Sequence, residues 1–193
     1  FHLAGQVNHV DSVRDPVKDL DINCRGTLVI LEACRKYNKN AKVIFSGTRG
    51  QYGATITLPV TEEHPMNPKG IYEITNLAAE KIVLSYHHVH HIKGVCLRIT
   101  NTYGPRHQMQ HDEYGVFNWF IRKAIDGETI HIFGDGSIVR DFLYVDDLVQ
   151  CLLMIGLCDK SYGSVFNSGS GIPISFLEIA EKLSHGGKYY YDF

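Results

Sequence analysis

The chain has 193 residues, enough to bury one good hydrophobic core or to form one domain and part of another. Its formal net charge is −2, and its lysines and arginines are scattered rather than clustered, which excludes a protein that binds nucleic acid through a basic surface. No apolar run approaches the roughly 20 residues needed to cross a bilayer, so we expect no membrane segment.

Apolar runs of strand length alternate with longer segments of helical period, a pattern typical of an α/β fold with helices on both faces of a parallel sheet. The expected strands are Phe1–Leu3, Lys42–Ser46, Gly94–Arg98 and Ser164–Asn167. The expected helices are Asp19–Tyr37, Ile71–Val89, Gly115–Asp126, Val145–Cys158 and Ser175–Leu183. Ser175 followed by Glu178 has the spacing of a capping box, in which each residue bonds the other's backbone N–H. The first and last residues read as interrupted elements, so we expect an internal piece of a longer protein.

Two regions differ in character along the chain. Residues 1–105 carry the regular alternation, whereas from about Pro105 onward loops and short elements dominate. We therefore expect two parts, residues 1–105 and 106–193, with 145–167 packing back on the first. Because ligands of open α/β sheets bind beyond the carboxyl ends of the strands, we expect the site there, between the two lobes.

The five cysteines point to a reducing compartment. They are odd in number, lie in apolar segments and lack the Cys-x-x-Cys spacing of zinc or redox sites. They are Cys24, Cys34, Cys96, Cys151 and Cys158. We expect small buried side chains and a cytoplasmic protein.

Nine short motifs follow one another along almost the whole chain. They are Phe1-His-Leu-Ala-Gly5, Asp11-Ser-Val-Arg-Asp-Pro16, Asn23-Cys-Arg-Gly26-Thr, Phe45-Ser-Gly-Thr48-x-x-x-Tyr52-Gly53, Pro68-x-x-x-Tyr72, Ala78-Ala-Glu80, Leu97-Arg98-x-x-Asn101-x-Tyr103-Gly-Pro-Arg106, Gly134-Asp-Gly136 and Val139-Arg140-Asp-Phe142-x-Tyr-Val-Asp146-Asp147. In this order they closely resemble the extended short-chain dehydrogenase/reductases of the NAD-dependent epimerase/dehydratase family, which act on nucleotide sugars. The resemblance implies a partial Rossmann-type doubly wound parallel sheet followed by a smaller substrate-binding region. Residues 1–105 would be the C-terminal part of the NAD(P)-binding Rossmann domain, and 106–193 mainly the substrate-binding region.

The resemblance implies an acid/base pair. Thr48 matches the family's Ser/Thr that hydrogen-bonds the reacting sugar hydroxyl, and Tyr72 matches the tyrosine that exchanges a proton with that hydroxyl. Asn76 stands where the family has a lysine, one helical turn beyond the tyrosine. An asparagine can still bond a ribose hydroxyl, but it has no charge to stabilise the phenolate. The nicotinamide ring, Arg49 or Lys69 would then have to supply that charge.

The same resemblance implies the cofactor NAD and a set of residues around its nicotinamide. These are His2, Leu3, Ala4, Gly5, Ser46, Gly47, Tyr72, Asn76 and Thr100. The family's glycine-rich pyrophosphate loop is absent from this sequence, so NADP is not excluded and we expect the fragment alone to bind NAD poorly.

A nucleotide-diphosphate sugar is the implied substrate. Its expected contacts are Thr48, Arg49, Asn101, Val116, Phe133 and Arg140. Arg140 suits this role because its planar guanidinium presents paired donors to phosphate oxygens. The alternative for Arg140 is an ion pair with Asp141 or Asp146.

The favoured activity is that of an isomerase of carbohydrate metabolism, an epimerase resembling UDP-glucose 4-epimerase that works through a transient keto sugar. Family dehydratases carry Asp-Glu directly after the Thr48 position, where this chain has Arg49-Gly50, which disfavours dehydration. A decarboxylase or dehydratase of the family stays an alternative, as does a binding protein that has lost turnover. Trp119 and the longer segment before it resemble the nucleotide-sugar 2-epimerases.

Two further expectations concern partners and metals. The family resemblance, together with apolar residues at Ala78-Ala79 and Ile82-Val83, implies a homodimer in which the helices at Asp19–Tyr37 and Ile71–Val89 form a four-helix bundle with their copies. His87 and His91 have a metal-like spacing but lie at a helix end without a carboxylate or cysteine nearby, so we expect no metal site.

Overall fold

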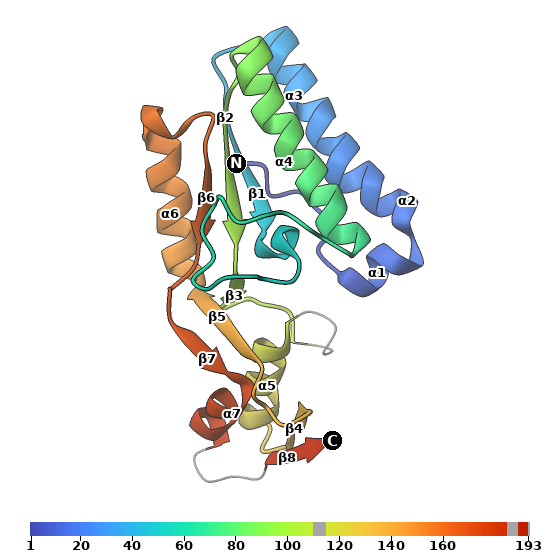
Figure 1. The fold of residues 1–193 in the computed structure, drawn as a ribbon, viewed down its shortest axis with the longest axis vertical. Coiled ribbons are helices and arrows are strands. Elements are labelled where there is room, and N and C mark those ends of the chain that lie inside the picture. Colours follow the sequence, from blue (N-terminus) through green and yellow to red (C-terminus); the bar gives the residue numbers. More distant parts are fainter. Residues whose placement is uncertain (110–114, 185–188, 193) are drawn as a thin grey trace. The chain divides into compact units, whose positions relative to one another are not determined.

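The computed structural model describes residues 1–109, 115–184 and 189–192, which form two compact units (Figure 1). Unit 1 comprises Phe1–Thr100 and Val149–Ser168. Unit 2 comprises the described residues of Asn101–Leu148 and Gly169–Phe193.

Unit 1 is built on a parallel sheet in the order β1-β2-β6. Its strands are β1 (Lys42–Thr48), β2 (Lys93–Ile99) and β6 (Val165–Ser168). The strand predicted at Phe1–Leu3 is reduced to one parallel bridge, in which His2 lies opposite Phe45. The predicted α/β fold with a parallel sheet is confirmed.

The helix predicted at Asp19–Tyr37 is present, but its first six residues after Asp19 form a π-helical turn. The chain forms α1 (His9–Arg14), α2 (Pro16–Asp19), a π-helical turn η1 (Leu20–Arg25) and α3 (Gly26–Tyr37). At this turn the Thr27 hydroxyl donates a hydrogen bond of 2.6 Å to the Asn23 carbonyl, and the Asn23 amide bonds the backbone of Gln6. The Thr27 hydroxyl thus bonds a backbone carbonyl of the turn, and the Asn23 side chain joins the turn to the segment before α1.

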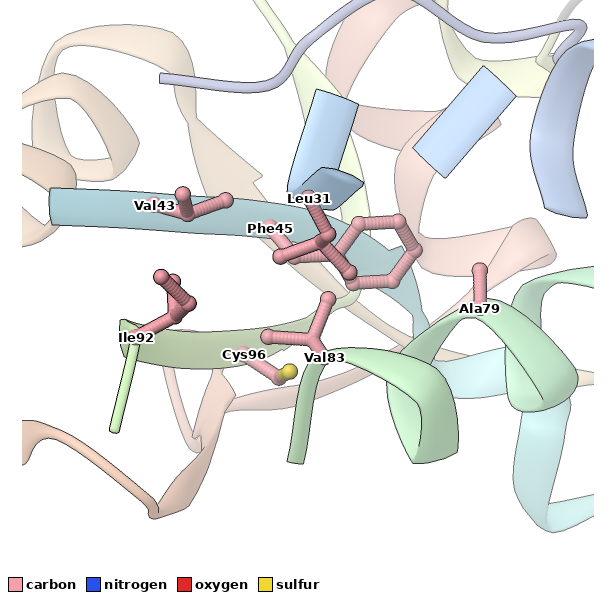
Figure 2. Packing of buried hydrophobic residues seen from close by; sticks show 7 residues of the cluster. All are labelled: Leu31, Val43, Phe45, Ala79, Val83, Ile92 and Cys96. Atoms are coloured by element: carbon pink, nitrogen blue, oxygen red, sulfur yellow. The ribbon is translucent and has the colours of Figure 1, made fainter. Parts of the chain in front are cut away.

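Helices α3 and α4 (Ile71–His90) lie side by side and cover one face of this sheet (Figure 1). Their apolar side chains interdigitate with those of β1 and β2, as Figure 2 shows for the central cluster. Its members are Leu31, Val43, Phe45, Ala79, Val83, Ile92 and Cys96. Burial raises the pKa of the Cys96 thiol, so this cysteine acts as a small apolar side chain, as the sequence predicts.

The opposite face of the sheet meets α6 (Val145–Leu157), whose residues from Val149 onward belong to unit 1. A Cβ atom at Gly156 would lie 3.5 Å from the Cδ1 atom of Ile44, an ordinary packing distance. A short turn, η3 (Asp159–Ser161), then leads into β6. Helices therefore cover both faces of the sheet in unit 1.

Unit 2 contains two small sheets. Their strands are β3 (Asn101–Tyr103), β4 (Ile130–Phe133), β5 (Val139–Tyr144), β7 (Pro173–Ser175) and β8 (Tyr189–Asp192). In one sheet β5 lies parallel to β3 and antiparallel to β7, and in the other β4 pairs with β8. The helices are α5 (Val116–Ile125) and α7 (Phe176–Ser184), which bury Phe120 and Ile179 against Ile130 and Ile132.

The predicted capping box is confirmed at the start of α7. The Glu178 carboxylate accepts hydrogen bonds from the Ser175 backbone N–H at 2.7 Å and from its hydroxyl at 2.8 Å, and the Ser175 hydroxyl accepts one from the Glu178 N–H at 3.1 Å.

Among the described residues, none of the helices has the length and apolar character that a membrane span requires.

Candidate active site

Thr48 ends β1 and starts the 3₁₀ turn η2 (Arg49–Tyr52). Its hydroxyl oxygen accepts a hydrogen bond of 3.1 Å from the Gly50 backbone N–H, which caps the turn. The sequence therefore places this hydroxyl at the carboxyl end of a parallel strand, the edge at which open α/β sheets bind ligands.

Tyr72 is the second residue of α4, which begins directly after Gly70. The structure places its phenol near the Thr48 side chain, since α4 contacts the η2 turn that follows Thr48. Burial raises the pKa of Tyr72, whereas the Thr48 hydrogen bond lowers it. The carboxylates of Glu73 and Asp19 raise this pKa further and the Arg49 guanidinium lowers it, with a net effect above the ordinary value.

His9 and Glu73 form a second pair beside Tyr72 that the sequence analysis missed. The His9 Nδ1 atom lies 2.8 Å from the Glu73 Oε1 atom, and the His9 ring meets the Tyr72 ring edge-on at a centroid distance of 4.8 Å. Burial opposes the charge of Glu73, but the hydrogen bond from His9 leaves its pKa lowered. His9 comes from α1, far away in sequence, and no local pattern signals the contact.

Asn76 is buried one turn beyond Tyr72 and its amide is already engaged. The Asn76 Nδ2 atom donates a hydrogen bond of 2.8 Å to the Tyr72 backbone carbonyl. The neighbouring Thr75 hydroxyl donates to the Asp19 carboxylate, which is also buried. Asn76, which stands where the family has a lysine, is therefore uncharged, and its side chain bonds the backbone of its own helix.

The residues predicted to contact the cofactor lie along the strand ends of unit 1. His2 is buried and its Nε2 atom lies 3.0 Å from the Thr27 hydroxyl, so its ring faces the protein interior. Leu3, Ala4 and Gly5 follow it and are exposed. Ser46, Gly47 and Thr100 lie at the carboxyl ends of β1 and β2.

These groups fit the nicotinamide half of NAD in their chemistry. Leu3, Ala4 and Gly5 are exposed after His2, and the hydroxyls of Thr48 and Tyr72, groups that can bond a ribose or sugar hydroxyl, lie near the carboxyl end of β1. A Cβ atom at Gly47 would lie 2.9 Å from the Gln51 side chain and 3.0 Å from the Leu97 carbonyl, so only glycine fits there without a shift.

Of the other predicted substrate residues, Arg49 is the first residue of η2 in unit 1 and the rest lie in unit 2. The Asn101 Nδ2 atom donates to the Asp141 carbonyl at 2.9 Å, and Val116 packs against the apolar core beside α5. Phe133 is the last residue of β4. Arg140 donates to the Val139 carbonyl at 2.8 Å and lies over the Phe176 ring at 6.0 Å.

Asp141, one of the two ion-pair partners considered for Arg140, instead bonds the loop that contains Ser170 and Gly171. Its carboxylate accepts hydrogen bonds from the backbone N–H groups of Ser170 and Gly171, each at 2.9 Å, and from the Ser170 hydroxyl at 2.7 Å. No local sequence pattern signals this contact, because the loop lies about thirty residues further along the chain.

The histidines at the end of α4 have local partners. The His87 Nδ1 atom lies 2.9 Å from the Ile92 carbonyl oxygen, and the His90 ring packs edge-on against Tyr86. In the part of the chain that the structure describes, no group of three or more His, Cys, Asp or Glu side chains has the geometry to hold a metal ion.

Comparisons with known proteins point to one family. A protein described as a putative UDP-glucose 4-epimerase from Methanocaldococcus jannaschii is 38% identical over 186 residues, which is 96% of this chain and 59% of that protein. CDP-paratose 2-epimerase of Salmonella typhi is 32% identical over 207 residues, covering 95% of this chain and 61% of that enzyme. The chain thus spans about three fifths of the length of these relatives.

A solved structure and a family model give the same result. The structure of a UDP-glucose 4-epimerase from Thermotoga maritima with UDP-glucose superposes with a TM-score of 0.92 at 35% identity, covering 100% of this chain and 63% of that one. Its likeness agrees with a Rossmann-type fold. The model of the NAD-dependent epimerase/dehydratase family matches residues 1–169. This chain, with its parallel sheet and its Thr48–Tyr72 pair, therefore belongs to the NAD-dependent epimerase/dehydratase family.

Proposed function

We propose that the complete protein containing this chain is an NAD-dependent nucleotide-sugar epimerase. The observation that carries the proposal is the placement of the Thr48 and Tyr72 side chains near one another at the carboxyl end of β1. A hydroxyl pair of this kind suits proton exchange with a sugar hydroxyl, and the relatives named above include 4- and 2-epimerases of nucleotide sugars.

In this proposal Thr48 orients the reacting sugar hydroxyl and Tyr72 removes its proton. NAD, when bound, would supply reversible hydride chemistry at the carbon that carries this hydroxyl. Tyr72 would hold the proton and later give it back, so that one residue acts as base and then as acid. His2, Leu3, Ala4, Gly5, Ser46, Gly47, Asn76 and Thr100 would hold the nicotinamide side of the cofactor.

The substrate side is assigned to unit 2 and to the turn after β1. Asn101 and Arg140 would contact the diphosphate, whereas Arg49, Val116 and Phe133 would contact the sugar or base. Unit 1 is then the cofactor-binding domain and unit 2 the substrate-binding region. The guanidinium of Arg140 keeps donor groups beyond its one bond to the Val139 carbonyl, which suits a phosphate contact.

The residues after Thr48 favour epimerisation over dehydration. Family dehydratases carry Asp-Glu there as the acid and base of water elimination, whereas this chain has Arg49-Gly50. A Cβ atom at Gly50 would lie 2.8 Å from the Cγ atom of Glu73, so the turn packs closely against the start of α4.

The buried, uncharged Asn76 favours a second candidate, a protein that binds cofactor and sugar without turnover. One experiment separates the two. The complete protein is incubated with NAD and a panel of UDP-, GDP-, CDP- and dTDP-sugars, and the products are analysed by NMR. A new epimer supports the enzyme and identifies the inverted carbon; NAD binding without any product supports the binding protein.

We further propose a homodimer formed through α3 and α4. Exposed apolar side chains lie on these helices and on the preceding turn, namely Leu20, Leu28, Val29 and Ile74. Ala79 and Val83 are buried in the core of unit 1, so these exposed residues supply the apolar surface instead.

The five cysteines are free, in keeping with a cytoplasmic location.

A further inference from the structure

A buried ion pair lies between α4 and the sheet of unit 1. The Arg98 guanidinium donates two hydrogen bonds of 2.8 Å to the Glu80 carboxylate, and side-chain exposure is 3% for Arg98 and 1% for Glu80. Burial opposes the guanidinium charge, but the bonds to Glu80 and Tyr52 leave the pKa of Arg98 raised. A buried pair of this kind is weak evidence for stability, because desolvation offsets its attraction.

The third nitrogen of the Arg98 guanidinium, Nη1, donates a hydrogen bond to Tyr52. The Arg98 Nη1 atom lies 2.7 Å from the Tyr52 hydroxyl oxygen, which in turn donates to the Asn167 Oδ1 atom at 2.6 Å. Arg98 also lies over the Tyr52 ring at 4.8 Å. Tyr52 is the last residue of η2, the turn that Thr48 caps. The ion pair is thus bonded directly to the turn that carries Thr48.

The same turn is bonded to the segment that precedes Tyr72. The Tyr52 carbonyl accepts a hydrogen bond of 3.2 Å from the Asn67 N–H, and Gly53 forms a parallel bridge with Asn67. Gly53 has φ 69°, and a Cβ atom there would lie 2.0 Å from the Asn67 carbonyl oxygen, so glycine is required. Asn67 lies four residues before the start of α4.

The loop between these two segments is held by the same side chains. Arg98 donates to the Glu62 carbonyl at 3.0 Å, and Asn167 donates to the Val60 carbonyl at 2.9 Å. Glu80 lies two turns beyond Tyr72 on the same helix. A closed set of bonds therefore links the turn that holds Thr48 with both the beginning and the middle of the helix that holds Tyr72.

We propose that Tyr52 and Arg98, with Glu80 as anchor, are positioning residues that keep the Thr48 hydroxyl within hydrogen-bond distance of the Tyr72 phenol. This inference rests on the proposed roles of Thr48 and Tyr72. None of the three side chains needs to touch the substrate. Their effect on chemistry follows from geometry, because a reacting pair displaced by about 1 Å loses much of its rate.

Tyr52→Phe is the sharpest variant, because it removes one hydroxyl and leaves the ring in place. In the complete protein we expect turnover to fall on the order of 10- to 100-fold with little change in the KM for the sugar. Tyr72 should also ionise at a pH higher by about half to one unit, because its hydrogen bond with Thr48 is weakened. Arg98→Lys keeps the positive charge but shortens the side chain. It should likewise lower turnover and raise the pH at which Tyr72 ionises.

Tyr86→Phe is the matched control. Tyr86 lies near the far end of α4 and also donates its hydroxyl to a side-chain oxygen, the Glu32 Oε1 atom at 2.8 Å. Both tyrosine variants should lower the thermal midpoint of unfolding, whereas turnover and the ionisation of Tyr72 should change only in Tyr52→Phe. The ionisation is followed by NMR of ¹³C-tyrosine, and the Tyr72→Phe spectrum identifies the Tyr72 resonance by its absence.

Two results would overturn the proposal. Either Tyr52→Phe and Tyr86→Phe reduce turnover equally, or Tyr52→Phe leaves the titration of Tyr72 unchanged. Failure of the proposed function is recognised separately, by absence of epimer in the wild type or by full activity of Tyr72→Phe. The NMR titration needs no turnover, so it decides the positioning role in either case.

Discussion

At the residue scale, Tyr72 lies in surroundings that resist its ionisation. Burial and the carboxylates of Glu73 and Asp19 raise its pKa, and the Thr48 hydrogen bond and the Arg49 charge offset only part of that effect. The neutral Asn76 adds no positive charge one turn away. A base with a raised pKa is deprotonated in a smaller fraction at neutral pH, so turnover should increase with pH well above neutrality.

Asn76→Lys should shift that increase to lower pH, because an ammonium group one turn away favours the phenolate. The measurement is a pair of pH–rate profiles on the complete protein, with Tyr72→Phe as the control that should abolish turnover while sparing the fold. Coinciding profiles would mean that another cation, with Arg49 as the first candidate, already replaces the lysine.

Arg140→Ala should weaken nucleotide-sugar binding and leave cofactor binding unchanged. A charge-assisted contact contributes about 1.5–3 kcal/mol, so the dissociation constant should increase on the order of 10- to 150-fold. Calorimetric titration with a nucleoside diphosphate measures this, and titration with NAD provides the control. An unchanged constant for the diphosphate would remove Arg140 from the site.

At the scale of elements, the start of α7 could be predicted from the sequence, whereas the π-helical turn η1 could not. The α7 start follows from a local pattern, since Ser175 and Glu178 satisfy each other's backbone groups three residues apart. The π-helical turn η1 does not, because the bonds that stabilise it involve Gln6, which lies outside the helix. Local patterns predict caps well and predict interruptions of a helix poorly.

Ser175→Ala should destabilise unit 2 by about 1 kcal/mol, because it removes the oxygen that caps the first turn of α7. Chemical denaturation followed by a probe in unit 2 measures the loss. Ser184→Ala is the control, since the Ser184 hydroxyl bonds the Glu181 carbonyl at the opposite end of the helix. Equal losses in the two variants would argue against the capping role.

At the scale of the whole molecule, the exposed apolar residues of α3 and α4 predict association of two copies. Val29→Glu should convert a dimer of the complete protein into a monomer at micromolar concentration, because Val29 is exposed and a charge there would be desolvated in the interface. Sedimentation velocity measures the state. Met154→Glu, at an exposed apolar position on α6, is the matched control and should leave the dimer intact.

The sequence by itself determined the class of the fold, the family and the two hydroxyl residues, because strand and helix periods and ordered motifs are local properties of a chain. Lys42–Ser46 and Ile71–Val89 were predicted to within a few residues for this reason. The tertiary structure alone revealed the contacts of Tyr72 with Thr48 and His9, and the bonds that join Arg98 to Tyr52. These partners come from separate elements, and their distances depend on how strands and helices pack rather than on any spacing in the sequence.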